Sequence, residues 1–373
     1  MTERNIHPTR AGLRLPVVAL IACLAWATMA CKDSTSDETG GSAAFDRSAM
    51  LAHYADSLIV PAYDGWLAAT QALHQQAEAF AASPAPNTRA ELQRLWLEAV
   101  RAWQWAAPYD FGPANQPTGK LTQEVATFPA DAAGIERYIA AGDNSLNNFD
   151  RATRGHYAIE YLIHGPEADK LATEANRRAY LLALTAHLQR LAQQTRSAWT
   201  TYRPLFVGNA GTDAGSSTTT LFNEFNVHYE LLKNFKFGLP LGQRAGQTQA
   251  EPQRVEAYYS GQSLALAREH FRVTEHVYYG RTKRGTDGPG FDDYVRSTAG
   301  GAELLQQTET QLRVAQQALN TIADSPSLAE QIRANASQPQ AAFQELLKLT
   351  RFFKSEISSR LGLAITYSSG DGD

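Results

Sequence analysis

Residues 91–105 read Glu-Leu-Gln-Arg-Leu-Trp-Leu-Glu-Ala-Val-Arg-Ala-Trp-Gln-Trp, and this stretch decides the fold class. Its apolar side chains recur at intervals of three and four residues, at Leu92, Leu95, Trp96, Ala99, Val100 and Trp103. That spacing aligns them along one face of an α-helix, whereas a half-buried strand alternates with a period of two. We therefore predict an amphipathic helix in this stretch.

The same helical pattern recurs along most of the chain. It is found at residues 52–80, 176–202, 222–237, 254–279, 302–322 and 341–361. Alternating runs of β-branched and aromatic residues, which are typical of strands, are almost absent. The sequence therefore predicts an all-α fold.

A stretch rich in Gly, Ser and Thr at residues 208–220 separates two groups of predicted helices. Its glycines are followed by no Gly-Lys-Ser/Thr, so we interpret it as a linker and not as a phosphate-binding loop. The linker leaves an N-terminal helical bundle at residues 45–207 and a C-terminal one at residues 221–373, each of ordinary bundle size. We expect the two bundles to pack together.

Composition excludes several classes of protein. The chain has 373 residues, 43% of them hydrophobic, with 34 Lys and Arg against 38 Asp and Glu. This balance is unlike that of a disordered chain or of a protein that binds nucleic acid. Both cysteines, Cys23 and Cys31, lie in the first 31 residues, so the predicted helical part has no disulfide, no thiolate nucleophile and no cysteine-rich zinc site.

The N-terminus has the pattern of a bacterial export signal. Basic residues up to Arg14 precede an apolar run at residues 17–30, which is shorter than the ~20 residues needed to span a bilayer. The run ends in Thr-Met-Ala-Cys31, which resembles a lipobox, and a polar stretch follows. We predict a lipoprotein signal peptide at residues 1–30, lipidation at Cys31 and a polar tether at residues 31–44.

Two alternatives to lipidation at Cys31 stay open. The residues before Cys23, Leu-Ile-Ala, match the lipobox letters better, but cleavage there would leave the apolar residues 24–30 on the mature end. The chain can also be an ordinary secreted protein, cleaved after a small residue. We favour a protein of the bacterial cell envelope that faces the periplasm, with the membrane as its partner through the lipid.

The densest group of chemically active residues lies at residues 154–166. His156, Glu160 and His164 follow one another at intervals of four, so on an unbroken helix they form one stripe, and their imidazole and carboxylate groups can share a metal ion. The simpler interpretation is a hydrogen-bonded or solvated polar face of a helix that ends at Gly165-Pro166.

Several motifs together resemble the imelysin family. Residues 155–165, Gly-His-Tyr-Ala-Ile-Glu-Tyr-Leu-Ile-His-Gly, resemble its G-x-H-x-x-E helix. Residues 101–103 and 111–113 resemble its early helix and exit turn, and Phe-Pro-Ala-Asp at 128–131 resembles its W-P-x-D element. Residues 255–264 are similar to its V-E-x-x-x-S-G-x-S-L segment. The resemblance extends from about residue 59 to the end of the chain.

This resemblance implies a bacterial envelope protein of two helical bundles, linked in several members to iron acquisition and classed with the M75 metallopeptidases. It places Tyr157 at the family's histidine position and implies that Tyr157 and Glu160, helped by Glu256, hold the metal. A phenol suits ferric iron better than zinc. The resemblance also implies a ligand cleft between the bundles, lined by Arg101, Trp103, Asp131, Glu256 and Ser260. For the aromatic Trp103, packing in the core is the simpler interpretation.

A hydrolytic site is not evident from the residues. Zinc peptidases commonly carry H-E-x-x-H on a helix, and the chain has no such stretch. His270 and His276 are six residues apart and so lie on opposite faces of a helix. We also find no serine-centred nucleophile elbow, and we name no catalytic residue.

We therefore expect a lipid-anchored envelope protein that binds a metal ion or a small ligand in a cleft between bundles. The expected cofactor is iron or another divalent or trivalent metal, and the expected partners are metal-uptake proteins of the envelope. A metal-dependent peptidase and a non-catalytic scaffold for a protein partner are the alternatives. We expect the basic, glycine-rich residues 280–290 to form a surface loop and not an anion site.

Lipidation is tested by the variant Cys31→Ser, which should move the protein from the membrane fraction to the soluble fraction. Cys23→Ser is the matched control and should leave the protein on the membrane. Two or more acyl chains anchor a protein firmly, so the wild type should withstand a salt wash. Intact-mass analysis of the wild type without added acyl chains would contradict the prediction.

Overall fold

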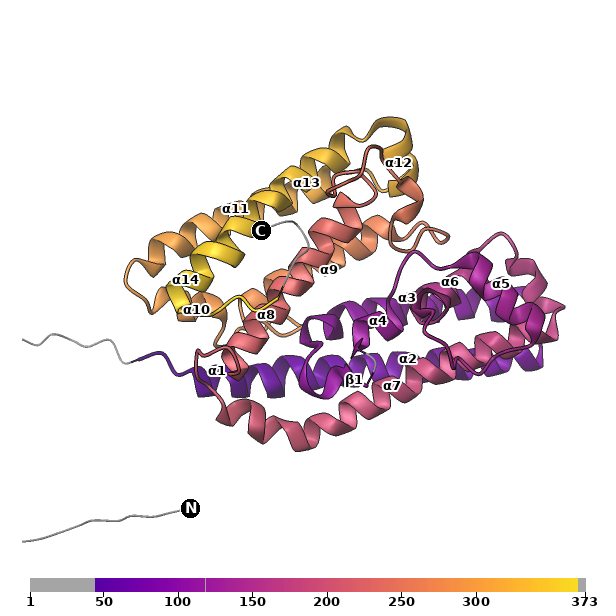
Figure 1. Cartoon of the computed structure of the whole chain (residues 1–373), viewed down its shortest axis with the longest axis horizontal. Helices are drawn as coiled ribbons and strands as arrows, with labels where there is room; N and C mark the ends of the chain where they lie inside the picture. The colour runs from indigo at the N-terminus through magenta and orange to yellow at the C-terminus, as the bar shows by residue number, and fades with distance from the viewer. Residues whose placement is uncertain (1–43, 118, 368–373) are drawn as a thin grey trace, which may run out of the picture. The chain divides into compact units, whose positions relative to one another are not determined.

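The computed structural model describes residues 44–117 and 119–367, and its helices confirm the predicted all-α fold (Figure 1). About 71% of the residues are helical and 1% are in strands. The predicted signal peptide, Cys31 and nearly all of the predicted tether lie outside the described residues. None of the described helices is both long and apolar enough to span a membrane.

Three long helices form the first layer. Helix α2 (Val60–Ala82) packs against α3 (Pro86–Ala106) and against α7 (Ala175–Gly208), as Figure 1 shows. Helix α2 is preceded by α1 (Arg47–His53) and by a π-helical segment, η1 (Tyr54–Ile59). The tryptophans Trp66, Trp96 and Trp199 are buried in this layer. The periodicity of residues 91–105 therefore predicted α3 correctly.

Short elements connect α3 to α7 and position the central helix α6 (His156–His164). In chain order they are η2 (Ala107–Tyr109), η3 (Gly112–Ala114), β1 (Asn115–Gln116), β2 (Gly119–Lys120), α4 (Leu121–Val125), α5 (Ala132–Ala141), η4 (Arg151–Thr153), then α6, and η5 (Ala168–Ala172). Strands β1 and β2 pair antiparallel. Helix α6 packs against both α3 and α7, and its residues 156–163 are all buried.

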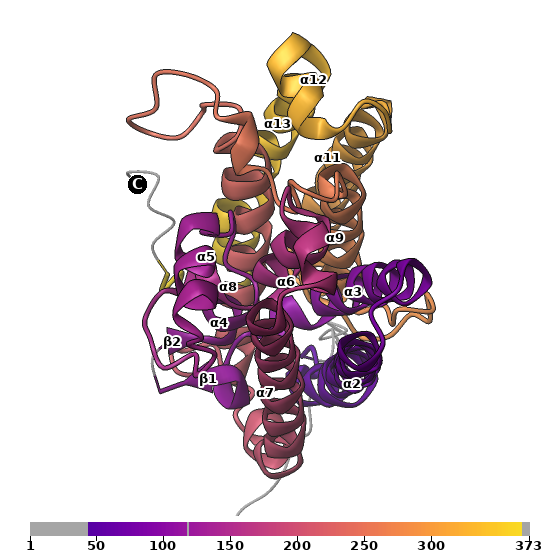
Figure 2. The ribbon, with the colours of Figure 1, turned by 90° about the vertical axis from the view of Figure 1, so that its right-hand side faces the viewer.

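The remaining helices lie to one side of α2, α3 and α7, as the two views show (Figures 1 and 2). In chain order they are α8 (Ser217–Glu230), the π-helical η6 (Leu231–Gly238), η7 (Pro252–Arg254), α9 (Ser263–Tyr278), α10 (Phe291–Arg296), α11 (Gly301–Thr321), α12 (Leu328–Asn335), α13 (Ser337–Thr350), the π-helical η8 (Arg351–Ile357) and α14 (Ser358–Leu361). Helix α11 packs against α13, and α9 packs against α3.

The predicted linker at residues 208–220 lies between α7 and α8, and its last residues belong to α8. The Ser217 N–H closes this turn by donating to the Asn209 carbonyl at 2.8 Å. All described residues belong to one compact unit. The division into domains at residues 207 and 221 stays a prediction.

Gly155 fixes where α6 begins. Its φ of +81° is one that side chains with a Cβ rarely adopt, and an added Cβ would lie 2.4 Å from the Val125 carbonyl oxygen. Only a residue without a side chain therefore allows the chain to pass the end of α4 at this distance and enter α6.

Alanine substitution at Gly155 and at Gly246 distinguishes the cost of backbone strain at a positive φ from the cost of a steric clash with a neighbouring backbone atom. Gly246 has a similar φ of +84°, but its added Cβ would meet no atom within 4 Å. Gly246→Ala should lower the free energy of unfolding by about 1–2 kcal/mol through backbone strain alone. Gly155→Ala should cost about 3 kcal/mol or more, because a backbone carbonyl must also move. Urea unfolding of both variants checks this, and equal losses would contradict it.

Candidate functional site

A cavity of about 210 Å³ lies against the middle of α6. Tyr157 and Glu160 contribute to it from α6, and the rest of its lining comes from residues 128–130 and from residues within 253–259. Phe128, Tyr258 and Tyr259 give it aromatic walls, and Tyr258 is 37% exposed. The cavity therefore combines one buried carboxylate with apolar walls.

Glu160 is the charged group of this cavity, and it is 2% exposed. Its Oε1 accepts hydrogen bonds from the Ser260 backbone N–H at 2.7 Å and from the Ser260 hydroxyl at 2.8 Å. Among the described residues, no cationic side chain lies within ion-pair distance of Glu160. Burial raises its pKa to about 7, although the hydrogen bonds from Ser260 lower it. At neutral pH this carboxyl can therefore carry a charge or hold a proton.

Beside Glu160 lies a second buried carboxylate, Glu256, whose charge is balanced. Lys236 forms an ion pair with Glu256 at 2.7 Å, and Lys236 also donates to the Gln104 side-chain carbonyl at 2.9 Å. Gln104 donates to Glu256 at 3.2 Å, and the Tyr157 hydroxyl donates to the same carboxylate oxygen. These four side chains form a buried network, and Glu160 is the acid that the network leaves without a cation.

The segment that carries Glu256 has an unusual backbone. Ala257 has a φ of +51°, which costs free energy for any residue other than glycine. The turn directs Glu256 into the buried network, and Ser260, four residues after Glu256, bonds to Glu160. The strained conformation therefore lets one short segment contact both acids.

The comparisons with known proteins identify the family of this chain. The sequence model of the imelysin family, also named peptidase M75, matches residues 59–351. The chain belongs to the imelysin family.

Two solved structures are similar to this imelysin-family chain. An imelysin-like protein from Psychrobacter arcticum 273-4 has a TM-score of 0.70 and 19% identity, and the match covers 86% of this chain and 97% of that one. A protein of Parabacteroides distasonis ATCC 8503, assigned as an iron-regulated protein A precursor, has a TM-score of 0.70 and 17% identity, and the match covers 84% and 95%. At these identities the likeness shows a common fold. No curated protein matches the chain.

The three residues of the predicted stripe on this imelysin-family helix contact three different neighbours. His156 is fully buried, and its Nε2 accepts a hydrogen bond from the Trp66 indole at 3.2 Å. Burial lowers the pKa of His156 to about 3, so the ring is neutral. His164 lies edge-on to Trp96, with ring centroids 5.3 Å apart. In the described part of the chain, no three His, Cys, Asp or Glu side chains are close enough to hold a metal ion.

The residues predicted for the ligand cleft divide into two groups. Glu256 and Ser260 bond to the two residues of α6 that line the cavity. Arg101 is exposed on α3, and Trp103 packs against Trp66 with centroids 4.8 Å apart. Asp131 caps α5 by accepting from the Gly134 N–H at 3.0 Å. None of the five predicted cleft residues lines the cavity itself.

Sequence reasoning missed Gln104 and Lys236. Gln104 lies between two tryptophans on a helix that was interpreted by its apolar face, and Lys236 is one of two lysines at residues 230–240. The sequence did show Gln104 as a polar side chain in an otherwise apolar stretch. Its partners Lys236 and Glu256 are 132 and 152 residues away, so local spacing could not reveal them.

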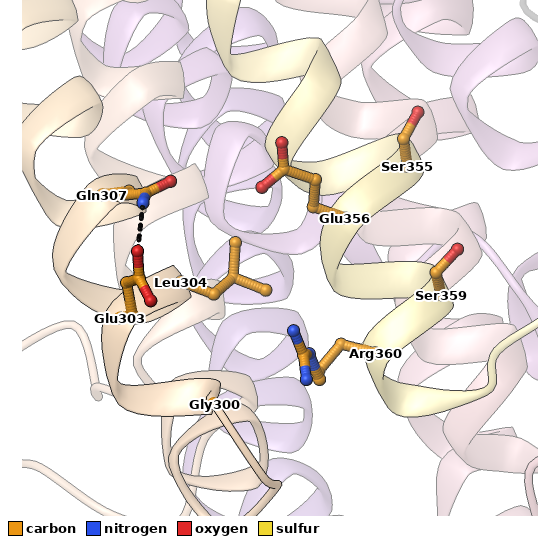
Figure 3. Close-up of a pocket in the computed structure, with 8 residues that line it drawn as sticks. All are labelled: Gly300, Glu303, Leu304, Gln307, Ser355, Glu356, Ser359 and Arg360. Atoms are coloured by element: carbon orange, nitrogen blue, oxygen red, sulfur yellow. Dashed lines mark hydrogen bonds between the residues drawn. The ribbon is translucent and has the colours of Figure 1, made fainter.

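A larger hollow, of about 760 Å³, lies between α11 and the segment formed by η8 and α14 (Figure 3). Its charged groups already have partners. Arg360 donates to the Ala299 carbonyl, Glu356 pairs with Arg351, and Glu303 accepts from Gln307 at 3.2 Å. This hollow therefore offers fewer free groups to a ligand than the Glu160 cavity does.

The pKa of Glu160 predicts how stability depends on pH. The folded state holds this proton up to about pH 7, whereas the unfolded chain releases it near 4.5. Protonated Glu160 therefore contributes its full stabilisation below about pH 4.5, and this contribution is lost as the pH rises to about 7. The total loss in the free energy of unfolding is on the order of 3 kcal/mol. Glu160→Gln removes this dependence, so between pH 5 and pH 8 the variant should gain about 2–3 kcal/mol relative to the wild type.

Urea unfolding at several pH values measures this difference. Ser260→Ala removes a hydrogen bond that lowers the pKa of Glu160, so in that variant the loss of stability should extend to higher pH. Parallel profiles for the wild type and Glu160→Gln would show that Glu160 titrates alike in the folded and unfolded chains.

Proposed function

We propose that this imelysin-family protein binds a small ligand, or a metal ion that keeps part of its own coordination shell, in the Glu160 cavity. We further propose that it serves in iron or metal handling at the bacterial cell envelope, anchored by lipid at Cys31. The observation that carries the binding proposal is the buried Glu160 carboxylate, which faces a cavity and has no cationic partner among the described residues. A ligand that brings a cation or a hydrogen-bond donor would supply the missing partner.

The donor atoms at the cavity fit a hard metal ion. Glu160 supplies a carboxylate oxygen, and oxygen donors suit hard cations such as ferric iron. Tyr157 would supply a phenolate oxygen, for which its hydroxyl would give up the hydrogen bond to Glu256 and release its proton to solvent as the cation binds. These two residues alone would leave a metal ion with open coordination positions, because Glu256 is already paired with Lys236. Glu160 and Tyr157 would hold the ion from one side, and its remaining ligands would come from water or a chelator. A bound cation would also favour the ionised carboxyl of Glu160.

The assignment to iron has a separate support. One structural neighbour is assigned as an iron-regulated protein A precursor, and the present chain shares its fold. The N-terminal pattern of an export signal agrees with a role in the envelope. The family name includes a peptidase class, but we propose a binding function, because the residues that reach the cavity contain no histidine.

Equilibrium dialysis against ferric nitrilotriacetate, followed by elemental analysis, tests the metal proposal on protein purified from the periplasm. The wild type should retain about one iron per chain, and Glu160→Gln should bind at least ~10-fold more weakly, as expected for the loss of a coordinating group. Glu303→Gln is the matched control and should bind as the wild type does. His164→Gln should also bind normally, whereas the stripe hypothesis requires it to weaken binding.

Tyr157→Phe gives an independent readout. A phenolate bound to ferric iron absorbs visible light by charge transfer, so the wild-type complex should be coloured and the Tyr157→Phe complex colourless. Native mass spectrometry of the same preparations detects a bound small molecule in place of a metal. If Glu160→Gln retains iron and every bound small molecule as tightly as the wild type, the proposed site is wrong.

A metal-dependent peptidase is the second candidate, and the pKa of Glu160 is the observation that favours it. A carboxyl with a pKa of about 7 can act as a general acid or base at neutral pH. Cleavage of denatured protein that is abolished both by a chelator and by Glu160→Gln would replace the binding proposal with this one. We expect no such cleavage.

A further inference from the structure

A second cavity, of about 490 Å³, has no lining residue in common with the Glu160 cavity. Ser57 and Leu58 line it from η1, and Pro61 and Ala62 from the start of α2. Trp105, Tyr109, His276 and Val277 line it as well, and residues 281–284 and 286 complete it. Its volume is within the range that encloses small organic molecules.

One side of this cavity is apolar and aromatic. Leu58, Tyr109 and Val277 are buried side chains that contribute to it. The Trp105 indole is fixed there, because its Nε1 donates to Glu269 at 2.6 Å and its ring meets His276 edge-on at 5.1 Å. A flat apolar group can therefore pack on a surface that is already in place.

The lining of the cavity also includes two cations that form no ion pair among the described residues. Lys283 and Arg284 line the cavity, and no carboxylate among the described residues lies within ion-pair distance of either. The Lys283 ammonium lies 5.5 Å from the centre of the Trp105 ring. The neighbouring bases are compensated, since Arg281 pairs with Asp287 at 3.0 Å and Arg272 pairs with Glu269 at 2.6 Å.

The loop that carries these two cations is held in position. At its base, the His53 Nε2 donates to the Gly280 carbonyl at 2.7 Å. At its tip, the Thr282 N–H donates to the Thr286 carbonyl at 2.9 Å, and the His276 Nδ1 donates to the Thr282 carbonyl at 2.9 Å. The tight turn at residues 282–286 therefore places Lys283 and Arg284 at the cavity before any ligand arrives.

We propose that this cavity binds a small organic anion with a flat apolar body, such as an aryl carboxylate. The apolar body packs against Leu58 and Trp105, and the anionic group pairs with Lys283 and Arg284. Burial lowers the pKa of Lys283, since its ammonium loses hydration, and a bound anion would restore the favourable interaction. Residues 281 and 283–287 are exposed, as expected for a surface loop, and our proposal departs from the sequence prediction only in assigning an anion site to this loop.

The test uses 2-naphthoate as the probe and 2-naphthalenemethanol as its neutral analogue, both titrated calorimetrically into the purified protein. The wild type should bind 2-naphthoate saturably and at least ~10-fold more tightly than the alcohol. Lys283→Gln combined with Arg284→Gln should remove this preference, with the affinity for the alcohol unchanged. Arg190→Gln combined with Arg313→Gln is the matched control, because it removes two exposed bases elsewhere, and it should keep the preference.

A second variant tests the position of the apolar body. Ala62→Phe places a ring inside the cavity and should abolish binding of both compounds, with thermal unfolding showing that the variant folds. The proposal fails if the wild type binds no 2-naphthoate, if it binds the acid and the alcohol equally, or if the double variant keeps the preference. These measurements use neither a metal ion nor a Glu160 variant, so their outcome is independent of whether the proposed function is correct.

Discussion

The buried ion pair between Lys236 and Glu256 is the interaction on which the site depends. Both side chains are almost completely buried, at 2% and 3% exposure. Removing one partner of such a pair leaves an uncompensated charge in the interior and costs about 3–5 kcal/mol. The pair also joins four parts of the chain, because Gln104 comes from α3, Tyr157 from α6, Lys236 from η6 and Glu256 from the segment before α9. Loss of either charge would therefore disturb the surroundings of Glu160 as well as the packing.

The π-helical segments lie where cavities form. Ser57 and Leu58 of η1 line the second cavity, and Ser355 and Glu356 of η8 line the open hollow of Figure 3. The third segment, η6, carries Lys236. A π-helical turn contains an additional residue, which rotates the following side chains relative to a regular α-helix. In η6, Lys236 lies within such a π-helical turn, and its side chain points into the protein interior and pairs with Glu256.

The fold was largely predictable from the sequence because a helix shows its buried face through local spacing. Residues 91–105 lie inside α3, and residues 176–202 lie inside α7. The predicted helix at residues 254–279 was wrong in its first part, since regular helix begins only at Ser263. Ala257 and Gly261 have positive φ values there, and apolar spacing does not reveal such a turn.

The candidate site was predictable only in part, because spacing gives the face of a helix and not what packs against that face. His156 and Glu160 do share a stripe on α6, but α6 is buried on all sides and its neighbours differ along its length. Trp66 meets His156, and Ser260 meets Glu160. The resemblance to the imelysin family named Tyr157, Glu160 and Glu256, which do lie close together, since a family motif retains long-range contacts that periodicity does not contain. That they hold a metal stays a prediction.

Three consecutive residues of α3 lie in three different surroundings: the aromatic core, the buried polar network and the second cavity. Successive side chains on a helix point about 100° apart. Trp103 packs on Trp66 in the core, Gln104 bonds to the Lys236 and Glu256 pair, and Trp105 borders the second cavity. Each of these positions has a separate chemical requirement, because a shift of one residue would place an indole against the buried ion pair and an amide in the aromatic core. The register of α3 is therefore constrained by the polar network and by both aromatic contacts together.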